Sequence, residues 1–159
     1  MADPGERVAG AEAARAPADG PRHVVFRVAG ERFALPLEAV REVVVPQPPF
    51  ARVPRASEAV RGVMNLRGRV VAVVDLAPLV GLAAQPLAGG AGHVLILERD
   101  RRALGFLVGG VLGVEPLAAA EGAAGGALVR GMAAARSGAV TLLAPDALAA
   151  EAEGLFAGR

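Results

Sequence analysis

Short apolar runs separated by turn residues follow one another along most of this chain, a pattern typical of a mainly β protein. Runs rich in valine, leucine and phenylalanine predict strands at 23–28, 33–37, 40–45, 93–97, 103–108, 111–114 and 140–143. Two short helices are also expected. The first, at 75–81, has Asp75 as its N-cap and Gly81 as its end, and the second begins near residue 144.

The stretch from 62 to 75 predicts a β-hairpin in the middle of the chain. Two apolar runs flank the polar segment Asn65-Leu66-Arg67-Gly68, and its glycine accepts the positive φ angle that a tight turn requires. Arg67 places a permanent positive charge in this turn, with five donors arranged in a planar fork. We interpret it either as a solvated turn residue or as a contact to a carboxylate or carbonyl of a partner.

Glu42 occupies an unusual position in the run 40–45. Alternation along a strand places it on the same face as Val40 and Val44, which are apolar. A carboxylate on such a face either pairs with an arginine or belongs to a surface that meets a partner. The sequence leaves both interpretations open.

The second half of the chain repeats the first. The run 93–97 resembles 23–26, the run 103–108 resembles 33–37, and Val129-Arg130-Gly131-Met132 resembles Val60-Arg61-Gly62-Val63. Each unit offers about five short strands, so we expect two small five-stranded barrels that pack together with a groove at their seam. The expected boundaries are a disordered tail at 1–22, a first barrel at about 23–82, a second at about 93–148, and a tail or helix end at 149–159.

Composition excludes several kinds of chemistry. The chain has no cysteine, and all 17 basic residues are arginines, so there is no thiolate, no disulfide and no lysine for a phosphate loop or Schiff base. His23 and His93 each open an expected strand without a second ligand at metal-binding spacing. We therefore expect no enzyme activity, no metal and no cofactor.

The longest apolar stretch, at 103–114, is too short to span a bilayer and is interrupted by glycines. The first 21 residues are rich in alanine, glycine and proline and lack the basic start and apolar middle of a signal peptide. These features predict a cytoplasmic location.

Three segments resemble the CheW family of chemotaxis coupling proteins. They read G-V-M-N-L-R-G-R-V-V-A-V-V-D-L at 62–76, F-A-L-P-L-E-A-V-R-E-V at 33–43 and G-F-L-V-G-G-V-L-G-V at 105–114. The resemblance covers 23 to about 148. It implies two pseudo-repeated, five-stranded SH3-like β-barrels with short helices, intertwined as one CheW-like domain.

The resemblance also implies a function that is not catalytic. Proteins of this family are scaffolds that join the cytoplasmic tip of a chemoreceptor to the regulatory domain of the histidine kinase CheA, within receptor arrays at the membrane. Transferred by position, the residues implicated in receptor and kinase coupling are Arg67, Glu42, Val40, Gly62, Asn65 and Gly68.

By the same resemblance, the helical hairpin of the receptor lies in the groove between the barrels. The apolar positions that would line this groove come from both repeats: Val24, Leu37, Val40, Val43, Val111 and Leu112. Such a contact gains affinity from buried apolar area at roughly 25 cal/mol per Å² before the costs of association.

The sequence is compatible with two alternatives to the chemotaxis adaptor. The first is an adaptor of the same type that serves a non-flagellar pathway such as gliding or surface sensing. The second is a small barrel that binds nucleic acid, which the all-arginine basic set suggests. The arginines are interspersed with acids, however, and the chain lacks tyrosine and tryptophan for base stacking, so this second alternative is disfavoured.

Overall fold

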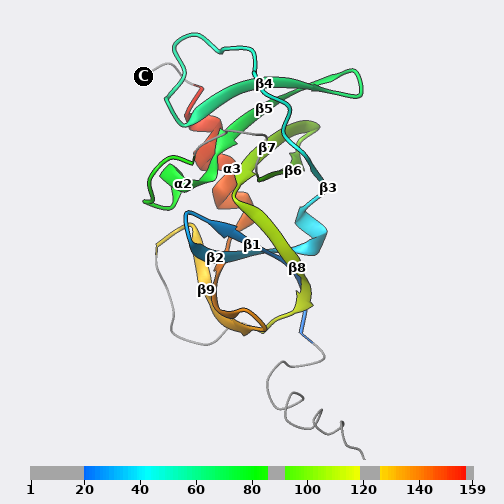
Figure 1. Ribbon diagram of the computed structural model, residues 1–159, viewed down its shortest axis with the longest axis vertical. Coiled ribbons are helices and arrows are strands. Elements are labelled where there is room, and N and C mark those ends of the chain that lie inside the picture. Colours follow the sequence, from blue (N-terminus) through cyan, green and yellow to red (C-terminus); the bar gives the residue numbers. More distant parts are fainter. Residues whose placement is uncertain (1–19, 86–91, 119–125, 157–159) are drawn as a thin grey trace, which may run out of the picture.

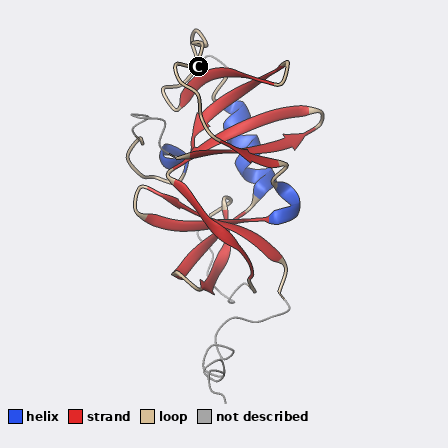
Figure 2. Ribbon diagram, turned by 45° about the vertical axis from the view of Figure 1, so that its right-hand side comes forward, coloured by secondary structure: helices blue, strands red, loops and turns tan. Residues whose placement is uncertain are grey.

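The computed structural model describes residues 20–85, 92–118 and 126–156, which form two five-stranded sheets and few helices (Figures 1 and 2). The mainly β fold class expected from the sequence is confirmed. In chain order the described elements are β1 (Arg22–Val28), β2 (Glu31–Pro36), the 3-10 helix η1 (Leu37–Ala39), β3 (Glu42–Val44), β4 (Val60–Leu66), β5 (Arg69–Asp75), α2 (Leu76–Leu79), β6 (His93–Arg99), β7 (Arg102–Val108), β8 (Gly110–Pro116), β9 (Val129–Ala135), β10 (Gly138–Leu143) and α3 (Pro145–Gly154).

The strand order of the two sheets shows that the repeats exchange strands. One sheet has the order β8-β1-β2-β10-β9 and the other β3-β6-β7-β5-β4. The two orders become identical when each strand is replaced by its counterpart five strands away. The internal repeat is therefore real, but the expected division into a barrel at 23–82 and a barrel at 93–148 is wrong, because each sheet combines a hairpin from one half with three strands from the other.

The connections explain why the halves interpenetrate. Pro36 ends β2, and η1 leads the chain out of the first sheet into β3 of the second. The return crossing is made between β7 and β8, where the N–H of Gly109 donates to the carbonyl of Arg27 at 2.7 Å. Parallel pairs β10–β2 and β5–β7 then complete the two sheets with strands of the opposite half.

The largest hydrophobic cluster lies between the sheets and not inside either of them. It includes Phe26 and Phe33, whose rings stack, together with Phe106 from the second sheet and Leu148 from α3. Each sheet also has a smaller cluster of its own, which includes Val25 and Val140 in the first sheet and Val71 and Ile96 in the second. Because most of the buried hydrophobic residues of the described chain belong to the shared cluster, the two sheets form one domain.

The ends of the fold differ slightly from those expected. β1 begins at Arg22, and the N–H of Leu117 donates to the carbonyl of Pro21 at 3.0 Å, so the expected tail at 1–22 is too long by these residues. Helix α3 continues through Gly154 and accounts for most of the expected 149–159 end. The remaining parts of both expected tails, 1–19 and 157–159, lie outside the described residues.

The short helix expected at 75–81 is confirmed as α2, with the side chain of Asp75 accepting a hydrogen bond from the N–H of Ala77.

None of the helices in the described ranges is long and apolar enough to cross a membrane.

Candidate functional site

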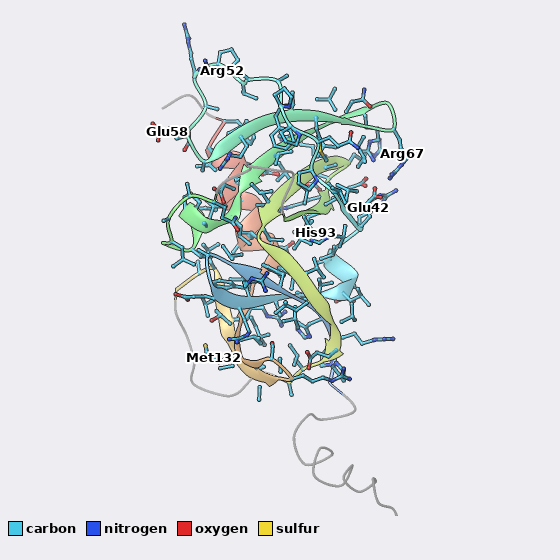
Figure 3. The ribbon with its side chains drawn as sticks, viewed as in Figure 1. Glu42, Arg52, Glu58, Arg67, His93 and Met132 are labelled. Atoms are coloured by element: carbon cyan, nitrogen blue, oxygen red, sulfur yellow. The ribbon has the colours of Figure 1, made fainter. Side chains whose placement is uncertain are left out.

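The β4–β5 hairpin ends in a two-residue turn made by Arg67 and Gly68. Their φ angles are 51° and 87°, which is the combination that suits a type I′ turn. The N–H of Gly68 donates to Oδ1 of Asn65 at 2.8 Å and so holds the turn closed. The prediction of positive φ at Gly68 is confirmed. Sequence reasoning missed the positive φ of Arg67, whose side chain is thereby directed from the tip of the hairpin (Figure 3).

Arg67 pairs with Glu42, and the two residues come from different elements. Arg67 donates through a guanidinium nitrogen to Oε2 of Glu42 on β3, and Figure 3 shows the two side chains near each other beside the hairpin tip. The Arg67 side chain is 68% exposed and that of Glu42 26%. Of the two interpretations left open for Glu42, pairing with an arginine is therefore observed, while the pair itself stays accessible to a partner.

A second group of charges, which the sequence analysis did not single out, extends this pair along the same sheet. Oε1 of Glu98 on β6 forms ion pairs with two arginines, lying 3.0 Å from Nη1 of Arg41 and 3.7 Å from Nη1 of Arg69 at the start of β5. Ion pairs of this kind bring together residues distant in sequence, which alternation alone does not predict. The result is a mixed-charge surface over β3, β6 and the hairpin.

Two cavities adjoin the turn, and Arg67 lines both. A cavity of about 170 Å³ lies between the turn and the charged group, bordered by Glu42, Arg69 and Ile96 among others. A second cavity of about 500 Å³ lies between β4 and the loop around Pro49. Arg67 therefore borders two hollows at the end of the hairpin, an arrangement suited to contact with another protein.

Gly62 has a packing role in this site. Its φ is +136°, and a Cβ atom there would stand 2.4 Å from the carbonyl oxygen of Ala51. Ala51 and Val63 exchange backbone hydrogen bonds of 3.0 and 2.8 Å next to this glycine. Gly62 thus lets the loop before β4 close against the strand, and it supports the hairpin from beneath.

A buried polar cluster fixes the base of the same hairpin. Asp75, which has no exposed surface, accepts from Arg61 at 3.0 Å, from the N–H of Gln85 at 2.8 Å and from Nε2 of Gln85 at 2.7 Å. Gln85 also donates to the carbonyl of Leu107 at 2.8 Å. The cluster joins β4, β5 and β7 to the segment after α2, so buried hydrogen bonds anchor the base of the hairpin.

The apolar positions expected to line a groove fall into three groups. Leu37 on η1, Val43 on β3 and Leu112 on β8 are 37%, 39% and 42% exposed. Val40 and Val111 are half-buried and pack against the shared core. Val24 is only 2% exposed, so its assignment to the groove is wrong: it packs within the shared core.

The exposed members of this set lie where the chain crosses between the sheets. η1 and β3 follow the outward crossing, β8 follows the return, and both η1 and β8 lie against β1. Val114 on β8, 41% exposed, was missed and belongs with them. We call Leu37, Val43, Leu112 and Val114 the seam surface.

The two histidines lie apart from the hairpin turn. Nδ1 of His23 lies 2.7 Å from the carbonyl oxygen of Pro21, and His93 opens β6. Within the described ranges, no three His, Asp or Glu residues gather in a way that could hold a metal ion. What the described geometry offers is contact chemistry: an exposed ion pair on an anchored hairpin and an exposed apolar surface.

Comparison with known proteins places this geometry in a family. The CheW-like domain matches residues 22–153. A chemotaxis protein CheW of Rhizobium meliloti (strain 1021) is 37% identical over 90 residues, which cover 55% of this chain and 56% of the relative. Protein PilI of Pseudomonas aeruginosa is 32% identical over 90 residues, covering 57% of this chain and 49% of that protein. The chain thus spans about half the length of the curated relatives that it matches.

The fold is also that of a solved scaffold. The crystal structure of scaffolding protein TtCheW from Thermoanaerobacter tengcongensis superposes with a TM-score of 0.68 at 24% identity, covering 79% of this chain and 90% of that one. This likeness extends over both sheets, as does the match at 22–153. The chain therefore belongs to the CheW-like domain family.

Proposed function

We propose that this protein is a non-catalytic chemotaxis adaptor that couples the cytoplasmic tips of chemoreceptors to the regulatory domain of the histidine kinase CheA. The observation that carries the proposal is the exposed Arg67–Glu42 pair on the hairpin of a CheW-like domain. An adaptor needs binding surfaces for its partners and no catalytic groups, and the site consists of charged and apolar contact surfaces.

The seam surface is the proposed receptor contact. Its four exposed apolar residues lie on three elements that border the junction of the sheets, which suits the apolar stripe of a helical hairpin. Scattered surface leucines need no explanation, but a set that follows both crossings between the sheets does. The receptor tip would also bring the protein to arrays beneath the membrane.

The hairpin turn is the proposed coupling element. The guanidinium of Arg67 can donate hydrogen bonds to a carboxylate or backbone carbonyl of the receptor or the kinase while Glu42 keeps it oriented. The Asp75 cluster and Gly62 anchor the base of the hairpin, so a displacement of the turn on partner binding would also move the strands of the sheet.

The test is a reconstitution of the purified protein with a receptor cytoplasmic fragment and CheA, scored by co-sedimentation and by kinase autophosphorylation. We expect Leu112→Asp to lose receptor binding and Arg67→Glu to lose receptor control of the kinase. Arg130→Glu, an exposed arginine on β9 far along the other sheet, is the matched charge-reversal control and should leave both intact. Normal coupling by Arg67→Glu would refute the assignment of the turn.

The pathway served is a separate question, because the same adaptor chemistry suits gliding or surface-sensing systems. One similar protein is named PilI and not CheW. Capture of partners from the native cytoplasm, followed by their identification, distinguishes a flagellar from a non-flagellar receptor and kinase. Recovery of neither a receptor nor a kinase would count against both pathways.

A further inference from the structure

A third cavity, with a largely apolar lining, lies against the face of the β4–β5 hairpin that carries Val63, Val70 and Ala72. It has a volume of about 520 Å³, and we call it the outer groove. Its lining comes from β4, β5 and β7, the loop before β4, the β6–β7 turn and the end of α3: Val53, Val63, Arg69, Val70, Ala72, Arg101, Arg102, Ala103, Leu104, Glu153 and Phe156. No member of the seam surface is among these residues.

The floor of the outer groove is a strip of three paired strands. Val63 pairs with Ala72, and Ala72 pairs with Leu104, so these side chains lie in one row across β4, β5 and β7. Val70, two residues before Ala72, points to the same face and is 72% exposed, the highest value among the exposed large hydrophobic residues of the described chain. Phe156 forms the wall where α3 has ended.

The rim of the outer groove is positively charged. Arg69, Arg101 and Arg102 border it, with Glu153 as the single carboxylate of its lining. Arg69 lies 3.7 Å from Glu98, which it shares with Arg41. For Arg101 and Arg102, both exposed, no carboxylate of the described residues comes within ion-pair distance. Within the part of the chain that the structure describes, these two charges are available to a ligand.

We propose that the outer groove docks an acidic amphipathic segment of a partner protein. Apolar side chains of that segment cover Val70 and Ala72, and its carboxylates pair with Arg101 and Arg102. The charge pattern selects this occupant: arginine forks bind carboxylates in bidentate fashion, and a basic segment would be repelled. The volume is within the range of roughly 300–1,000 Å³ that is usual for binding pockets, enough for several apolar side chains.

The site is distinct from the surfaces assigned to the adaptor function, although Arg69 lines both the outer groove and the small cavity beside Arg67. A segment bound in the outer groove would therefore contact the charged group that surrounds the coupling turn. Nucleic acid fits the groove less well, because Phe156 is the only aromatic residue of its lining.

The test uses the full-length protein and a fluorescein-labelled peptide of about 15 residues, four helical turns, with leucines at helical spacing and glutamates elsewhere. A second peptide replaces every glutamate by lysine. Fluorescence anisotropy should show saturable binding of the glutamate peptide only, weakened by salt. Val70→Glu and Arg102→Glu should each weaken binding by about tenfold or more, because each removes a contact and adds repulsion.

Arg101 has a φ of 65°, so Arg101→Asn removes its charge with a residue that tolerates this conformation, and it should also weaken binding. Leu112→Asp and Arg130→Glu are controls outside the groove and should bind the peptide normally, which separates this result from failure of the adaptor function.

Four outcomes would each overturn the proposal. Two concern the peptides: equal binding of both, or binding that no groove variant changes. The other two concern a different occupant: binding of single-stranded DNA in place of the peptide, or self-association of the chain that Val70→Glu abolishes.

Discussion

Arg67 pairs with Glu42, a residue 25 positions earlier in the chain, and the pair links the tip of the β4–β5 hairpin to β3 at the edge of the same sheet. Since the Arg67 side chain is 68% exposed, water competes for both partners and the pair adds little to stability. Its position at a projecting turn is consistent with a role in binding. Stability and coupling can therefore be separated by experiment.

The first prediction concerns the energy of this pair. In a double-mutant cycle with Glu42→Gln and Arg67→Gln, urea unfolding should give a coupling energy below about 1 kcal/mol, as for other exposed ion pairs. Each single variant should unfold near the wild-type midpoint. A coupling energy several times larger would mean that the pair is a structural element and that loss of coupling by Arg67 variants reflects damage to the fold.

The second prediction concerns Asp75. Each of its oxygens accepts two hydrogen bonds, from Ala77 and Gln85 at Oδ1 and from Arg61 and Gln85 at Oδ2. In Asp75→Asn, either orientation of the amide would turn an NH₂ group toward donors, and Arg61 would keep its bond to the carbonyl of Gln85 but lose its carboxylate partner. Urea unfolding should show a loss of about 3–5 kcal/mol, the usual result of breaking a buried ion pair.

Asp146→Asn is the matched control, because Asp146 is exposed in the first turn of α3 and should change stability by no more than about 1 kcal/mol. Equal losses in both variants would contradict the role assigned to the buried cluster.

Local sequence patterns predicted the elements well and their partners poorly. Alternation and turn residues located the strands, and Asp75 and Gly81 bounded α2, because these features depend on neighbours in the chain. The exchange of strands does not. A repeat of five strands is equally consistent with pairing within a unit or between units, and the deciding contacts, such as Gly109 with Arg27, join residues far apart.

The same distinction separates the site residues. Arg67, Gly68 and Asn65 were identified because a tight turn has a local signature. Val24 was assigned to the wrong place, since a valine that faces the shared core has the same local pattern as one at a surface. Glu98 and Val114 were missed because their roles arise from long-range pairing and a bulge in β8.

A third prediction separates close approach from backbone strain. Gly62 and Gly81 have φ angles of +136° and +81°, but only at Gly62 would a Cβ atom collide, 2.4 Å from the oxygen of Ala51. Gly81→Ala should lose about 1–2 kcal/mol from the left-handed conformation alone. Gly62→Ala should lose a further 1–3 kcal/mol, roughly the cost of overpacking, in urea unfolding. Similar losses at the two positions would show that the loop before β4 is free to move away.

The fourth prediction tests the division of the expected groove residues into surface and core. Leu112→Asp should unfold near the wild-type temperature, because the side chain is 42% exposed. Val24→Asp should fail to fold or melt far lower, since it buries an unpaired carboxylate in the shared core. Thermal unfolding followed by circular dichroism measures both. A stable Val24→Asp variant would restore this valine to the groove.

A fifth prediction follows from the exchange of strands. A chain cut between 85 and 92 yields a fragment with β1 to β5 and a fragment with β6 to β10, and neither contains a complete sheet. The first fragment would leave β1 without β8 and β5 without β7, and the shared core would lose half of its residues.

Isolated hairpins are at best marginally stable in water, so each fragment alone should give the poorly dispersed NMR spectrum of an unfolded chain. Mixed in equal amounts they should recover the dispersed spectrum of the intact protein, because every missing strand is supplied by the other half. If either fragment folded alone, pairing within one half would be sufficient for a sheet, and the exchange would not be what makes the two sheets a single domain.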